Sequence, residues 1–169
     1  NSIPTEARNH FFGLQYAKKD LKGIAIFDNI DKPLQEHPQL IESMWVKREI
    51  ENYLCFPEVL LAYASKYESL DLFSIADSER RKAAMEESMK EVENALKTLR
   101  KISPWNDATK VTNDFLDPLF EKYFEKLGLP NLLRKTDYHI LAGFVPKEKI
   151  DKEIIDKLDM ICEVTTSKK

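Results

Sequence analysis

The sequence predicts a helix-rich α+β fold, in which a small, partly parallel sheet is followed by a C-terminal helical bundle. Three observations predict it. Residues 23–27 form a short, continuous apolar run, which is typical of a strand buried on both faces. Later segments carry apolar residues at steps of three and four, the spacing of amphipathic helices. Only four glycines occur in 169 residues, fewer than the turns of an all-β protein call for.

The first part of the chain combines strands with short helices. Pro57 suits the first turn of a helix, because the N–H that proline lacks has no partner there in any case. Pro33 and Pro38 mark a loop. The elements expected are a helix over 1–20, strands over 23–27 and 41–48 with a polar loop over 28–40 between them, and a helix over 57–67.

The rest of the chain is expected to be helical. The first helix, capped by Asp77 or Ser78, ends before Ser103-Pro104. On its solvent-exposed face, Glu93 and Lys97 are four residues apart, a spacing that allows an ion pair. Its apolar stripe consists of Met85, Met89, Val92, Leu96 and Leu99. Further helices are expected from Asp117-Pro118 to Gly128, near 137–144 and near 147–164. The change in pattern near 70–77 divides the chain into an α/β segment, 1–70, and a helical region, 71–169.

The charge balance excludes a strong general attraction to nucleic acid. Lys and Arg total 26, Asp and Glu total 29, and the formal net charge is -3. A contact with DNA would therefore need a local patch or a metal. The two cysteines form no CxxC pair, and no apolar run approaches the roughly 18 residues of a membrane span, so we expect reduced thiols, no membrane and a cytoplasmic location. Because the chain begins with Asn1 rather than Met, we expect either a processed start or a fragment of a longer protein.

The end of the first strand is the strongest chemical feature. Asp28 follows the buried strand directly, and Asp31 comes three residues later. Functional groups collect at the carboxyl ends of strands in open α/β sheets, and carboxylates there can hold a hard cation such as Mg²⁺. The alternative, which is the more common role of such an aspartate, is a turn residue.

A second cluster lies at the junction between the second strand and the following helix. Residues 47–54 place the basic pair Lys47-Arg48 beside Glu49 and Glu51. Glu51 could add a carboxylate to a metal site at Asp28, since neighbouring strand ends lie close in space. The alternative is a cluster of caps and salt bridges.

These segments resemble the second half of a Toprim domain. The resemblance rests on residues 21–28, on Trp45 to Leu54 and on 57–64, and the Arg-Glu-Ile-Glu-Asn-Tyr run from Arg48 is its most specific part. More narrowly, the chain resembles the Toprim portion that follows the ABC-type ATPase in nucleases of the OLD (overcoming lysogenization defect) family. A weaker similarity extends to Trp105, to 115–120 and to 135–139.

The resemblance implies a metal-dependent nuclease acting on DNA with Mg²⁺ or Mn²⁺. It makes Asp28 the first acid of an Asp-x-Asp element, Glu49 and Glu51 candidate acids beside it, and Lys135 a candidate for contacting the phosphate. It also implies an ATP-binding domain upstream. From the residues alone, Lys135 could instead pair with a neighbouring acid.

The chain departs from the family pattern in three ways. Ile30 stands where the second aspartate is expected, so that Asp31 is the next acid. The Toprim glutamate of an earlier strand has no counterpart in residues 1–20, and no G-x-x-x-x-G-K-[ST] loop is present. We therefore expect this chain to be inactive alone, as the C-terminal portion of an ATPase-linked nuclease. The competing hypothesis is a non-catalytic interaction or homodimerisation module with a degenerate acidic site.

Overall fold

The computed structural model of the chain describes residues 4–30, 32–66 and 72–166. It has the predicted helix-rich α+β fold, with a small parallel sheet of two strands. In chain order the elements are α1 (Pro4–Gln15), β1 (Gly23–Phe27), β2 (Leu40–Met44), the 3-10 helix η1 (Ile50–Tyr53), α2 (Pro57–Ala64), α3 (Leu72–Thr98), the π-helix η2 (Thr112–Leu116), α4 (Asp117–Lys126), the 3-10 helices η3 (Lys135–Phe144) and η4 (Lys147–Lys149), and α5 (Lys152–Thr166).

The chain forms two compact units. The first unit contains residues 1–48 together with 150–169, and the second unit contains residues 49–149. The division near residue 70 is predicted from the change from strands with short helices to helices alone. The two units, in contrast, are defined by contacts in space. The division of the protein into domains therefore stays a prediction.

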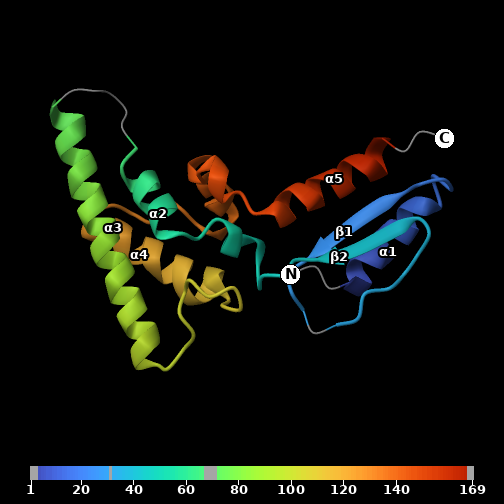
Figure 1. The fold of residues 1–169 in the computed structure, drawn as a ribbon, viewed down its shortest axis with the longest axis horizontal. Coiled ribbons are helices and arrows are strands. Elements are labelled where there is room, and N and C mark those ends of the chain that lie inside the picture. Colours follow the sequence, from blue (N-terminus) through green and yellow to red (C-terminus); the bar gives the residue numbers. More distant parts are fainter. Residues whose placement is uncertain (1–3, 31, 67–71, 167–169) are drawn as a thin grey trace. The chain divides into compact units, whose positions relative to one another are not determined.

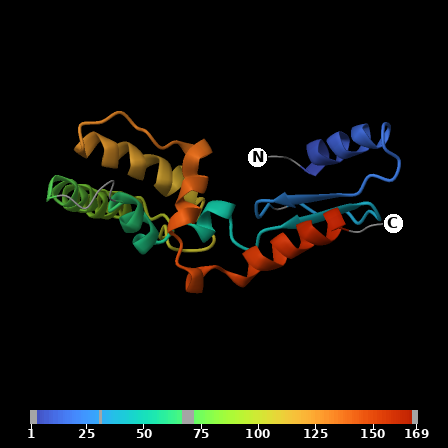
Figure 2. The same ribbon diagram turned by 90° about the horizontal axis from the view of Figure 1, so that it is seen from above.

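The first unit is a thin sandwich in which α1 and α5 cover opposite faces of the β1–β2 sheet (Figure 2). The strands are parallel, with Gly23 beside Leu40 and Phe27 beside Met44. Successive side chains of a strand point to opposite faces. Accordingly, Glu42 of β2 binds Arg8 of α1, while the neighbouring Ser43 accepts a hydrogen bond from Lys157 of α5.

The second strand is shorter than the sequence predicts. We expected it over 41–48, but β2 ends at Met44. The Trp45 N–H still donates to the carbonyl of Phe27, where β1 ends, and the next N–H, of Val46, donates instead to the carboxylate of Glu153 on α5. With no further residue of β1 to pair with, the chain leaves the sheet.

The second unit packs α2, α3, α4 and η3 around one apolar core (Figure 1). Pro57 begins α2 as predicted, and Gly128, with φ of 69°, follows the C-terminal end of α4. The apolar stripe of α3 is buried except at its last residue, because α3 ends at Thr98 and leaves Leu99 67% exposed. The sequence did not predict the π-helix η2, which precedes α4 directly. Within the described residues, no helix has both the length and the apolarity needed to cross a membrane.

Candidate functional site

The carboxylate of Asp28 stands at the carboxyl end of β1, in the first unit. Asp28 as a residue is half-buried, and its carboxylate has no hydrogen-bond or ion-pair partner among the described residues. Its neighbour Asn29 joins the two segments that follow the strands. The Asn29 N–H donates to the carbonyl of Arg48 at 3.1 Å, its side-chain amide donates to the carbonyl of Val46 at 2.6 Å, and the Arg48 guanidinium donates to the Asn29 carbonyl at 2.8 Å. The two strand ends thus meet at one edge, as parallel pairing requires. Asp31 lies outside the described residues.

Glu49 has a structural role in the second unit. It is only 5% exposed, and its carboxylate accepts the backbone N–H of Thr112 at 2.9 Å. It also forms a reciprocal capping box with Asn52 at the start of η1, in which the Glu49 N–H donates to the Asn52 side chain at 2.8 Å. Asn52 in turn donates to the carbonyl of Thr109 at 3.2 Å. The capping interpretation of Glu49 is therefore confirmed, and its catalytic role stays a prediction.

Glu51 lies near a buried tyrosine of the same unit. The Tyr138 hydroxyl donates to the Oδ1 atom of Asp117 at 2.6 Å. Burial raises the pKa of Tyr138 above its ordinary value, and the negative charges of Asp117, Glu51 and Asp137 raise it further. The sequence did not predict this group, although it placed Asp117 at the start of a helix.

Lys135 is the first residue of η3 and is exposed. Its ammonium has no ion-pair partner among the residues that the structure describes. Asp137, two residues later, accepts the N–H of Arg134 at 3.1 Å, which is the contact that the third residue of a helix makes in a capping box. The predicted alternative for Lys135, a salt bridge to a neighbouring acid, is not formed with any acid of the described ranges.

The described residues do not by themselves complete a site for Mg²⁺ or Mn²⁺. Such ions need several oxygen ligands in a tight shell. Nowhere in the described ranges do three side chains of His, Cys, Asp or Glu gather closely enough to hold a metal ion. Asp28 belongs to the first unit, whereas Glu49 and Glu51 belong to the second unit. No single unit therefore contains all three predicted acids.

The two cysteines are free. Cys55 is buried in the core of the second unit, and burial raises the pKa of its thiol, which makes it a poor nucleophile. Cys162 is exposed on α5. The expectation of unbridged thiols agrees with the structure.

No protein family, curated protein or solved structure matches this chain. The resemblance to Toprim domains of OLD-type nucleases therefore stays a prediction from the residues named above.

Proposed function

We propose that this chain is the C-terminal portion of a metal-dependent, ATPase-linked DNA nuclease of the Toprim type, acting in the cytoplasm. The observation that carries the proposal is the carboxylate of Asp28, which has no partner among the described residues and stands at the carboxyl end of a strand in a parallel pair. A carboxylate that no donor of its own fold occupies is available to bind a hard cation, which prefers oxygen ligands. Under this proposal the Toprim glutamate and the ATP-binding domain lie upstream in the native protein, and the nuclease activity needs them.

The acids have unequal roles under this proposal. Asp28 faces the metal, and Glu51 remains a candidate acid in the second unit. Glu49 holds the fold together instead, because its carboxylate already accepts the N–H of Thr112. Lys135, exposed and without an acid partner among the described residues, is the candidate phosphate contact.

The test uses the native gene product that contains this chain. Calorimetric titration with Mn²⁺ and cleavage of plasmid DNA are measured for the unmodified protein, for Asp28→Ala and for Asp20→Ala. Asp20 is an exposed aspartate of the same unit outside the strand end, so it serves as the matched control. Of the three proteins, we expect only the Asp28→Ala variant to lose Mn²⁺ binding and DNA cleavage. Equal binding and cleavage by all three proteins would contradict the proposal.

One observation favours the second hypothesis, an interaction module. The exposed side of α5 carries Ile155, Leu158 and Cys162 at steps of three and four, and Ile155 and Leu158 are 49% and 56% exposed. Such a stripe can pair with the same helix of a second copy. Sedimentation velocity of the chain distinguishes the hypotheses. If the chain is a dimer and Leu158→Glu dissociates it, the interaction-module hypothesis is supported. If the chain is a monomer at all concentrations, dimerisation through α5 is excluded.

A further inference from the structure

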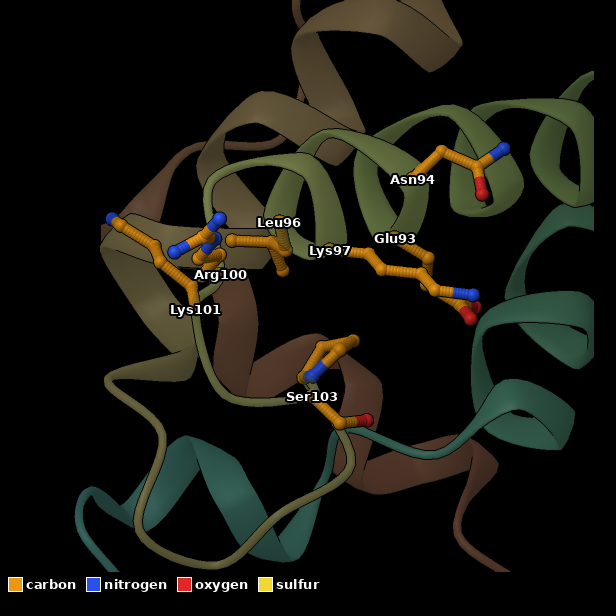
Figure 3. A pocket seen from close by; sticks show the side chains of 8 residues that line it. Glu93, Asn94, Leu96, Lys97, Arg100, Lys101 and Ser103 are labelled. Carbon is orange, nitrogen blue, oxygen red and sulfur yellow. The ribbon is translucent and has the colours of Figure 1, made fainter.

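A cavity of about 380 Å³ lies beside the C-terminal end of α3, in the second unit (Figure 3). Its apolar part is formed by the buried side chains of Leu96 and Pro104. Figure 3 shows Arg100 and Lys101 on one side of it and Lys97 with Glu93 on the other. Cavities of this size hold small organic ligands rather than single ions. None of the residues discussed for the strand-end site lines it.

The charge at this cavity is mainly positive and only partly neutralised. Lys101 is paired with Asp114, with 2.7 Å between its Nζ atom and Oδ1. Lys97 and Arg100 are exposed and have no ion-pair partner in the part of the chain that the structure describes. The pair between Glu93 and Lys97 that their spacing predicts is not formed. Two cations therefore remain available to an anionic ligand.

The backbone of Arg100 adds an independent observation. Arg100 has a φ of 54°, the only positive value at a non-glycine residue among the described positions. It closes α3 in a Schellman motif, in which the Lys101 N–H donates to the carbonyl of Leu96 and the Arg100 N–H to that of Lys97. Glycine is the most stable residue at such a position, because a Cβ is disfavoured there. The chain thus carries a guanidinium where the backbone conformation favours glycine, which makes the Arg100 side chain a candidate for a function.

The lining selects the chemistry of the ligand. Lys97 on one side of the cavity, or the fork of Arg100 on the other, suits a phosphate. Leu96 and Pro104 form a largely buried apolar floor against which the edge of a ring can rest, while the Glu93 carboxylate can accept a hydrogen bond from the edge of a base. A phosphate alone would leave Glu93 as a repelling charge. We propose that this cavity binds a nucleoside phosphate, either a free nucleotide or one unit of a single-stranded nucleic acid. This proposal does not rest on the proposed nuclease function.

The first experiment titrates the whole chain with four probes followed by calorimetry: adenosine monophosphate, adenosine, inorganic phosphate and a short oligodeoxyadenylate. We expect the monophosphate to bind about tenfold or more tightly than adenosine or phosphate alone, because each lacks one half of the contacts. Tighter binding of the oligonucleotide than of the monophosphate identifies nucleic acid as the source, and equal or weaker binding identifies a free nucleotide. Binding of none of the probes, or of phosphate as tightly as the monophosphate, overturns the proposal.

The second experiment separates binding from folding. Arg100→Gly removes the guanidinium and relieves the backbone, so we expect a higher thermal midpoint together with about tenfold weaker binding of the monophosphate. Lys97→Ala should weaken binding without raising the midpoint. Lys90→Ala removes an exposed cation of the same helix that does not line the cavity, and should change neither. An Arg100→Gly protein that is more stable and binds as tightly as the unmodified chain contradicts the proposal.

Discussion

Different kinds of contact stabilise the interior of each of the two units of this molecule. In the second unit, one apolar core joins α2, α3, α4, η2 and η3, and Phe120 stacks on Tyr138 and meets the edge of Tyr63 within it. The first unit buries few large side chains, and polar clamps join its layers: Arg8 to Glu42 on one face of the sheet, and Lys157 to Ser43 on the other. Since apolar burial is the main source of folding free energy, the second unit should tolerate acid and salt better.

The donors that surround a carboxylate indicate whether an acidic residue stabilises the fold. Glu42 and Glu49 are both enclosed by donors of their own unit, and both serve the fold. Asp28 has no such donors among the described residues. An acid that the fold does not use is the better candidate for chemistry.

The largest expected effect is that of truncating a core aromatic in the second unit. Phe120 is fully buried, so Phe120→Ala should cost about 3–5 kcal/mol of the free energy of unfolding. The matched change in the first unit is Phe11→Ala, which removes a less enclosed ring from α1 and should cost less. Urea unfolding followed by Trp105 in a Trp45→Phe background reports the second unit, and Trp45 in a Trp105→Phe background reports the first. A larger loss for Phe11→Ala than for Phe120→Ala would reverse the comparison.

Removal of the Glu49 carboxylate is expected to have the next largest effect. Glu49→Ala leaves the buried N–H of Thr112 without an acceptor and opens the capping box, at a cost of about 1.5–3 kcal/mol. Glu51→Ala, in the same helix, removes a half-buried carboxylate and should cost less. Urea unfolding of the two variants, followed by Trp105, compares them. If Glu49→Ala is as stable as the unmodified protein, the structural role assigned to Glu49 is wrong.

Acidification should have the smallest effect, and it should act on the first unit. The hydrogen bonds from Arg8, followed by that from the Gln35 N–H, hold the pKa of Glu42 below its ordinary value of 4.5. A lowered pKa in the folded state gives stability that is present above about pH 4.5 and is lost as the pH falls through the lowered value. We expect Trp45 fluorescence to change in this range before that of Trp105. Arg8→Ala should flatten the acid response of Trp45; an unchanged response would show that another group controls it.

The sequence predicts those parts of the fold that are decided locally. The apolar run of β1, the stripe of α3 and the proline and glycine that bound α2 and α4 each act over a few residues. Contacts across the chain were beyond such patterns. The joining of α5 to β1 and β2 in one unit depends on contacts such as that between Lys157 and Ser43, which are far apart in sequence.

The candidate site shows the same limit. The position of Asp28 follows from the strand before it, and the sequence therefore placed it at the sheet edge. The role of Glu49 depends on Thr112, which is 63 positions away, and its box with Asn52 lacks the Ser or Thr by which capping boxes are recognised. No local pattern could have separated the structural acid from the one left without a described partner.

We propose that Asp28 binds a metal, whereas Glu49 stabilises the fold. Paramagnetic broadening by Mn²⁺ in NMR spectra of the ¹⁵N-labelled chain tests it most directly, because broadening detects even the weak binding expected of an incomplete site. We expect Mn²⁺ to broaden the amide signals of Asp28 and Asn29 and to leave those of Asn52 and Thr112 sharp, and we expect the broadening to disappear in Asp28→Ala. Broadening centred on Asn52 and Thr112, with Asp28 unaffected, would contradict it.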